Sequence, residues 1–282
     1  MHAVLKINCR DRPGIVSSVT QLIFEAGGNI LDAQQHREKL DGQFFIYVKF
    51  DVTSLNVSQT VFDERLSALA ENNGYIWSLI YSDRRKRMAI MVSKYDHCLY
   101  DLLLKHMYGE LATDIPLIIS NHPDLENVAD HFGIAYHHIP RGADNREAAD
   151  KQALALCSEN SVDFIAMARY MQILTPILLD AYPNRIINVH HGFLPAFKGA
   201  RPYHQAYEKG VKIVGATSHY ASEDLDMGPI IAQETERVNH GYGPSDMIRI
   251  GRSIESKVLA EAVKAHAEDR IIVFKGRTIV FD

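Results

Sequence analysis

Asn188 and His190 stand two residues apart at the end of an apolar run, with types and spacing that point to chemistry. In an extended chain, side chains two residues apart point the same way, so this amide and this imidazole would converge. Such a pair can hold a carbonyl oxygen and stabilise the negative charge that develops on it. Two hydrogen-bonded polar residues at a strand end would give the same pattern, and the spacing alone does not choose.

The dipeptide His190-His191 raises the alternative of a metal site. Adjacent side chains of a strand point to opposite faces, which is poor geometry for two ligands of one ion. We therefore expect no metal here.

An acidic segment supplies a second candidate group, because Glu223, Asp224 and Asp226 precede the pair Gly228-Pro229. One carboxylate near an imidazole can move protons if its surroundings tune its pKa. A solvent-exposed acidic turn would have the same composition. The pattern does not decide which of the three carboxylates takes part.

The elements that must position these groups occupy residues 88–282, where short apolar runs alternate with helical patterns. This alternation predicts a mostly parallel sheet with helices on both faces. Strands are predicted at 88–92, 117–120, 164–168, 185–189, 212–220 and 230–234, and a long helix at 244–268. Ligands of such sheets bind beyond the carboxyl ends of strands, so we expect the site in the loops after residues 92, 168 and 189 and in 221–229.

The first 82 residues predict a separate α/β domain with the order strand, helix, strand, strand, helix, strand. Apolar residues recur at helical spacing from Ile15 to Ala26, after Pro13 and before Gly27-Gly28. Asp41-Gly42 is typical of a hairpin, and strict alternation at 44–50 predicts a half-buried strand. The remaining predicted elements are strands at 3–8, 29–39 and 75–81 and a helix at 57–73.

Five charged residues at 83–87, four of them basic, predict a solvated linker between the two domains. A nucleic-acid patch is the alternative, but no aromatic residue interrupts the run and the chain has a net charge of −5. A protein that coats nucleic acid needs excess positive charge, so we expect no nucleic-acid partner.

The whole composition is that of a globular protein, with 46% hydrophobic and 23% charged residues. No apolar run approaches the roughly 20 residues that span a bilayer, so we expect no membrane partner. The three cysteines are far apart in the chain, which favours a reducing compartment. The first residues alternate like a strand and lack an apolar leader, so a cytoplasmic location is expected.

The motifs around these candidate residues resemble known families. Asn188-x-His190, with FLPAFKGARPYHQA at 193–206 and HYASEDLDMGPIIAQE at 219–234, resembles the formyltransferases that use 10-formyltetrahydrofolate. The first domain, with DRPGIV at 11–16 and GGNI at 27–30, resembles an ACT domain. Together the two resemble the formyltetrahydrofolate deformylase family over nearly the whole chain. The resemblance implies a ferredoxin-like ACT domain at 1–82, a linker at 83–87 and a Rossmann-like formyltransferase domain at 88–282.

The resemblance also implies functional residues, which fall at matching positions of this sequence. The implied catalytic residues are Asn188, His190 and Asp226. The implied folate-binding residues are Met171, Gln172, Ile173 and Leu174, which wall a pterin pocket, and Ala221, Ser222, Glu223, Asp224 and Leu225, which form a loop over the pterin ring.

The implied reaction is hydrolysis of 10-formyltetrahydrofolate to formate and tetrahydrofolate, which supplies formate for one-carbon and purine metabolism. Asn188 would donate to the formyl oxygen, His190 as imidazolium would stabilise the oxyanion, and Asp226 would accept a proton from water and help return one to N10. No cofactor beyond the folate substrate is expected. The alternatives are formyl transfer to an amine acceptor and a non-catalytic folate or amino-acid sensor.

Two departures from the family pattern bear on this reaction. Related deformylases have Ser where this chain has Gly192, so any contribution of that hydroxyl is lost. Relatives that formylate glycinamide ribonucleotide grip its phosphate with a Gly-rich loop after the first strand. Here residues 92–99 contain no glycine and carry Asp96, which favours water as the acceptor. Residues 97–103 also match the deformylase pattern HCLxDLL.

The ACT resemblance implies regulation and assembly. Asp11, Gly14, Asn29 and Ile30 would hold an amino-acid effector, often between two paired domains. Glycine and methionine are the candidate effectors, since both connect to one-carbon metabolism. A homo-oligomer built from dimers, including a tetramer or hexamer, is expected. A purely structural dimerisation module is the alternative.

Overall fold

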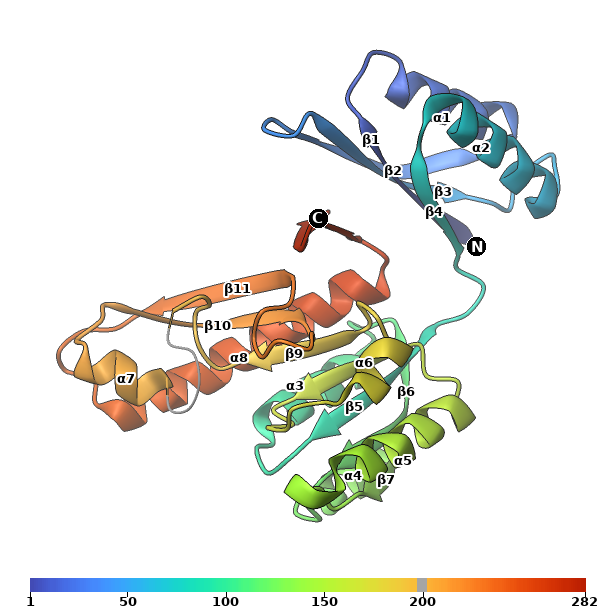
Figure 1. Cartoon of the computed structure of the whole chain (residues 1–282). Helices are drawn as coiled ribbons and strands as arrows, with labels where there is room; N and C mark the ends of the chain where they lie inside the picture. The colour runs from blue at the N-terminus through green and yellow to red at the C-terminus, as the bar shows by residue number, and fades with distance from the viewer. Residues whose placement is uncertain (197–201) are drawn as a thin grey trace. The chain divides into compact units, whose positions relative to one another are not determined.

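The computed structural model describes residues 1–196 and 202–282, which form two units (Figure 1). One unit comprises Met1–Arg84 with Phe281–Asp282, and the other comprises Arg85–Val280. Part of the motif at 193–206 therefore falls at 197–201, outside the described residues. In the part of the chain that is described, no helix is long and apolar enough to cross a membrane.

The first unit has the predicted order of strands and helices, in an antiparallel sheet with strand order β2-β3-β1-β4. Gly27 and Gly28 end the first helix where a side chain would not fit: a Cβ at Gly27 would lie 2.9 Å from the Ser54 carbonyl oxygen. The elements are β1 (His2–Arg10), α1 (Ile15–Glu25), β2 (Asn29–Glu38), β3 (Gln43–Asp51), α2 (Gln59–Asn73) and β4 (Ile76–Tyr81).

The boundary between the units differs from the expected linker at 83–87, because strand β5 begins at Lys86. Both basic residues at its start have partners. Lys86 pairs with Asp269, and the Arg87 backbone N–H donates to the Asp163 carboxylate at 2.8 Å. The final residues also depart from the expected boundaries, since Phe281 stacks on Tyr47 in the first unit at 5.5 Å between ring centroids.

The second unit contains a seven-stranded sheet with order β11-β10-β9-β8-β5-β6-β7. Strands β5 to β9 are parallel, and β10 runs antiparallel to both neighbours, so the mostly parallel sheet is confirmed. The strands are β5 (Lys86–Val92), β6 (Thr113–Ser120), β7 (Ala135–His138), β8 (Phe164–Ala168), β9 (Ile186–His190), β10 (Ile213–Tyr220) and β11 (Ile230–Arg237). The helices are α3 (His97–Met107), α4 (Glu126–Phe132), α5 (Arg146–Glu159), α6 (Pro176–Ala181), α7 (Pro202–Glu208) and α8 (Pro244–Ala267).

Two features of this unit were not predicted from the sequence. Strand β7 carries two histidines in four residues, so it lacks the apolar run that marks the other strands. The hairpin of β12 (Ile271–Phe274) and β13 (Arg277–Val280) has no strong alternation and follows directly on the long helix.

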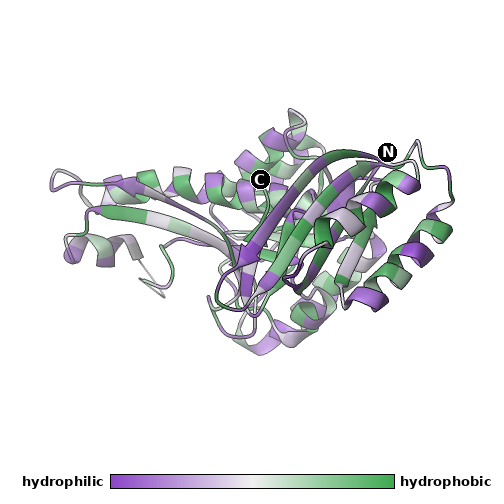
Figure 2. Ribbon diagram, turned by 90° about the horizontal axis from the view of Figure 1, so that it is seen from above, coloured by the Kyte–Doolittle hydropathy of each residue, from purple (hydrophilic) through white to green (hydrophobic). Residues whose placement is uncertain are grey.

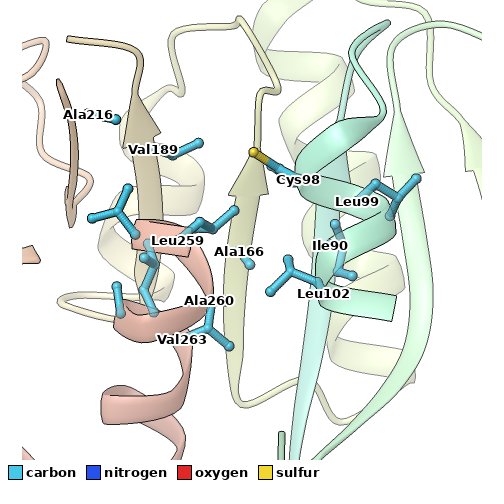
Figure 3. Close-up of a cluster of buried hydrophobic side chains, with 14 of the residues drawn as sticks. Ile90, Cys98, Leu99, Leu102, Ala166, Val189, Ala216, Leu259, Ala260 and Val263 are labelled. Carbon is cyan, nitrogen blue, oxygen red and sulfur yellow. The ribbon is translucent and has the colours of Figure 1, made fainter. Parts of the chain in front are cut away.

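The sheet buries a separate apolar core on each face. Helices α3, α4 and α8 cover one face, where Ile90, Leu102 and Leu259 pack together (Figure 3). Helices α5 and α6 cover the other face. The helices carry hydrophobic and hydrophilic bands along their length, as expected for elements with one buried side (Figure 2). The carboxyl ends of β5, β8 and β9 are thereby fixed at one edge of the sheet.

Candidate active site

Asn188 and His190 point to the same face of β9, as residues two apart in a strand must. Ile187 and Val189 belong to the core under α3 and α8, whereas Ile186 belongs to the core under α5 and α6. The alternation therefore directs Asn188 and His190 toward the α5–α6 side. His191 points the other way, toward Tyr203.

His219 lies directly across from Asn188 in the register of β9 and β10. Its Nδ1 is 2.9 Å from the Tyr220 carbonyl oxygen, which accepts only, so Nδ1 carries the hydrogen. In the neutral ring, Nε2 then accepts a hydrogen bond from Asn188 Nδ2 at 3.2 Å. This bond uses one N–H of the Asn188 amide, and the second N–H has no acceptor among the described residues.

Asp226 is the carboxylate that the fold brings to these residues. Its backbone has φ of 59°, a left-handed conformation that Asp tolerates better than most residues. Its Oδ2 lies 3.1 Å from His190 Nδ1, its Oδ1 lies 3.7 Å from His219 Nε2, and its side chain is 8% exposed. Burial favours the neutral acid but is outweighed by the hydrogen bond from His190, so the pKa of Asp226 lies far below its ordinary value.

Asn188, His190 and Asp226 line a cavity of about 280 Å³ at the carboxyl ends of the parallel strands. Its wall is mostly apolar, and Asn188, His190 and Asp226 form one polar group in it together with His219, which is the usual form of a small-molecule site. The other lining residues are Met167, Arg169, Met171, Gln172, Ile173, Leu174, Leu179, Val189, His191, His219, Ala221, Ser222 and Leu225.

The residues expected to bind the folate divide into two groups. All four from Met171 to Leu174 line the cavity, as do Ala221, Ser222 and Leu225. Glu223 and Asp224 are exposed and do not line it. The Asp224 backbone carbonyl instead accepts a hydrogen bond from the Ser222 hydroxyl at 2.8 Å, which closes the turn.

A buried ion pair that sequence reasoning missed supports the wall at 171–174. Arg141 and Asp150 pair at 3.0 Å with their side chains almost fully buried. The same guanidinium donates to the Ile173 carbonyl at 2.7 Å, and Asp150 accepts from the Thr175 backbone N–H at 2.7 Å. The pair therefore fixes the backbone of this wall from behind.

Gly192 retains a role for its backbone. Its carbonyl accepts a hydrogen bond from the Thr217 hydroxyl at 3.0 Å, and the same hydroxyl accepts from the Leu194 N–H at 3.0 Å. Thr217 faces His190 across the register of β9 and β10. The turn after His190 is thus tied to β10 through main-chain groups.

His190 Nε2 is buried and has no hydrogen-bond partner among the described residues. Such an unsatisfied polar atom in a native site needs a reason, and a ligand is one. Asp226 holds the ring through Nδ1, so Nε2 is the atom left to act on a bound molecule. Together with the free N–H of Asn188, it makes two donors available to a developing oxyanion once the imidazole is protonated.

The residues expected to bind an effector do not meet within one chain. Gly14 is the residue just before α1, and Asp11 lies close to it in the chain. This end of the sheet is the one at which Arg10 of β1 lies opposite Gln43 of β3. Asn29 pairs with Asp51, at the other end of the sheet and of the helix. An α1 of 11 residues separates the two groups by roughly 16 Å.

Comparison with known proteins finds relatives for both units. The family model described as formyl transferase matches residues 86–263, and the ACT domain model matches residues 3–72. A formyltetrahydrofolate deformylase of Synechocystis sp. is 46% identical over 281 residues, covering 100% of this chain and 99% of the relative. One of Bacillus subtilis is 45% identical, covering 99% and 93%.

Solved structures give the same picture. The crystal structure of a formyltetrahydrofolate deformylase from Pseudomonas syringae pv. tomato matches with a TM-score of 0.95 and 40% identity, covering 100% of this chain and 94% of that one. A glycinamide ribonucleotide transformylase from Symbiobacterium toebii matches 73% of this chain and 98% of its own, with a TM-score of 0.68 and 30% identity.

Proposed function

The chain belongs to the formyltetrahydrofolate deformylase family, and from this membership we propose that it hydrolyses 10-formyltetrahydrofolate to formate and tetrahydrofolate. The observation that carries the proposal is the set of contacts that the two ring nitrogens of His190 make. Asp226 holds its Nδ1, while its buried Nε2 has no partner in the described part of the cavity wall. An imidazole held in this way is placed to act on a substrate carbonyl.

The apolar part of the cavity takes the pterin ring of the folate. Met171, Ile173 and Leu174 supply its wall, and Leu225 lies on the loop that returns toward Asp226. The formyl group then lies at the polar end, beside Asn188 and His190. Glu223 and Asp224 belong to the same loop, but their side chains are exposed and neither residue lines the cavity.

Hydrolysis follows from the positions of the three polar side chains. Water attacks the formyl carbon, and the ionised carboxylate of Asp226 takes a proton from that water. Asn188 and protonated His190 donate to the oxyanion. The C–N10 bond breaks, N10 receives a proton returned through Asp226, and formate leaves.

The reaction needs no group beyond the folate substrate and water. The proposed partners are this folate, an amino-acid effector and further copies of the same chain.

The wild-type protein is expected to release formate and tetrahydrofolate in equal amounts from 10-formyltetrahydrofolate in plain buffer, with no amine added. Tetrahydrofolate is followed by absorbance and formate by NMR. Folate that binds without any release would contradict the proposal. Release that begins only when an amine is added would establish the formyltransferase alternative.

The ACT unit is proposed to bind an amino acid between two copies of the chain. The separation of Gly14 and Asn29 along α1 supports this arrangement, because one copy would supply the helix start and the other the amide. A free helix N-terminus suits a carboxylate.

We expect calorimetry with glycine or methionine to detect binding to the wild-type chain, and we expect the bound amino acid to change the hydrolysis rate. Asn29→Ala removes an exposed amide and should abolish the binding while leaving the rate without effector unchanged. A wild-type chain that binds neither amino acid and keeps its rate would leave the unit a structural dimerisation module.

A further inference from the structure

A buried ionic cluster adjoins the catalytic cavity and takes no part in the mechanism above. It consists of Arg169, Glu255, His97 and Tyr203, and we call it the Arg169 cluster. Glu255, 2% exposed, lies 3.5 Å from Arg169 Nε and 2.8 Å from His97 Nε2, and accepts from the Tyr203 hydroxyl at 2.8 Å. Burying such charges is costly even when they are paired, so the cluster calls for a function.

The cluster and the proposed folate wall lie on opposite faces of the sheet. Tyr203 and Cys98, the neighbour of His97, belong to the core under α3 and α8, and Figure 3 places Cys98 beside the carboxyl end of β8. Leu174 and Leu179 belong to the core under α5 and α6. Arg169, which directly follows β8, also lines the catalytic cavity. Arg169 is therefore the member of the cluster that reaches the cavity wall, and Glu255 holds it from the α3–α8 side.

Arg169 is held in place against its backbone preference. Its φ of 63° is left-handed, a strained conformation for a residue with a side chain. The guanidinium lies 4.9 Å from the centroid of the Tyr95 ring and is itself 8% exposed. Its Nε and Nη1 have no hydrogen-bond partner among the described residues. The Glu255 carboxylate and the Tyr95 ring thus hold the side chain in this conformation, and its volume occupies part of the cavity wall.

The surroundings of Glu255 are shaped to keep this arrangement. Gly251 makes room for Tyr203, since a Cβ at that position would lie 2.1 Å from its ring. Burial favours neutral Glu255 but is outweighed by the His97 hydrogen bond and the Arg169 charge, so the pKa of Glu255 lies below its ordinary value. His97, Cys98 and Glu255 bring three possible metal ligands within 4.8 Å of one another. The carboxylate already bonds His97 and Tyr203, however, and faces a guanidinium.

We infer that the Arg169 cluster closes the acceptor side of the cavity, so that water but no larger nucleophile reaches the formyl carbon. The inference rests on the proposed function. With the folate on one wall, an acceptor must approach from the other, where Arg169 stands. An amine that gained access would attack the formyl carbon, the C–N10 bond would break, N10 would take up the proton lost by the amine, and a formamide would form in place of formate.

The test is the ratio of N-formylglycinamide to formate made from 10-formyltetrahydrofolate in the presence of glycinamide. The full-length wild-type chain is expected to make formate with little formamide. Arg169→Ala should raise the ratio at least about tenfold, the lower range of what a steric contact in a pocket confers. Lys86→Ala is the control. It breaks the ion pair with Asp269 at the amino end of β5, away from the cavity, and should give the same product ratio as the wild type.

The outcomes separate the inference from the proposed function. No formate from the wild-type chain without amine defeats the function itself. An unchanged ratio in folded Arg169→Ala, or loss of both products, overturns the inference, because Arg169 would then act in the chemistry or not at all. If Arg169→Ala does not fold, Tyr95→Ala is the second test. It removes the ring against which the guanidinium lies, at a side chain that is 45% exposed, and should also raise the ratio of formamide to formate. An unchanged ratio in that variant also overturns the inference.

Discussion

Asp226→Asn is expected to lower kcat for formate release by about 10³- to 10⁴-fold, the upper range for a lost general base. The amide keeps the shape of the carboxylate and can still accept from His190, but it takes no proton from water. It also removes the negative charge that lies 3.1 Å from His190 Nδ1. Stopped-flow or steady-state assays of tetrahydrofolate release measure the effect.

Folate binding should survive this change, because the apolar wall that holds the pterin ring is untouched. Calorimetry with tetrahydrofolate checks this. Asp130→Asn, at an exposed carboxylate of α4, controls for the loss of one negative charge and should retain wild-type turnover. A kcat for Asp226→Asn within tenfold of the wild type would show that the base lies elsewhere.

Asn188→Asp is expected to lower kcat by about 10²- to 10³-fold, the usual effect of removing one donor from an oxyanion site. The substitution keeps the size of the side chain but replaces the N–H donor with an acceptor. It also places a negative charge where the oxyanion must develop. The His219 ring, which now orients the amide, would have to be protonated to bond the new carboxylate.

The loss should appear in kcat more than in KM, since the interaction strengthens as the oxyanion forms. Asn239→Asp is the matched control, because its side-chain oxygen accepts from the Gly241 N–H and an Asp can do the same. Equal losses in binding and turnover for Asn188→Asp would indicate that the amide holds the ground-state substrate instead.

Local pattern was sufficient for much of the fold. The apolar residues of α1 recur at helical spacing and those of β3 alternate, so both elements could be predicted from the sequence. The apolar runs at β8 and β9 likewise predicted buried parallel strands. Because side chains alternate along a strand, Asn188 and His190 were predicted to share one face. Strand β7 was missed because its histidines give no apolar signal.

The candidate site depended more on the tertiary structure. Nothing local distinguishes Asp226 from Glu223 and Asp224, and the family resemblance was needed to choose it. The left-handed turn at Asp226 directs that carboxylate to His190 while the other two remain exposed. His219 meets Asn188 through the pairing of β9 with β10, and Arg169 meets Glu255 from a distant helix.

The sequence alone thus determined the presence of two domains, most of their secondary structure and the strand that carries the paired amide and imidazole. These follow from spacing within a few residues, where backbone geometry sets which side chains share a face. The tertiary structure decided which strands are neighbours, which carboxylate turns inward and which ions are buried beside the cavity. Those outcomes depend on the packing of both faces of the sheet, which joins residues far apart in the chain and leaves no local signal in any one segment.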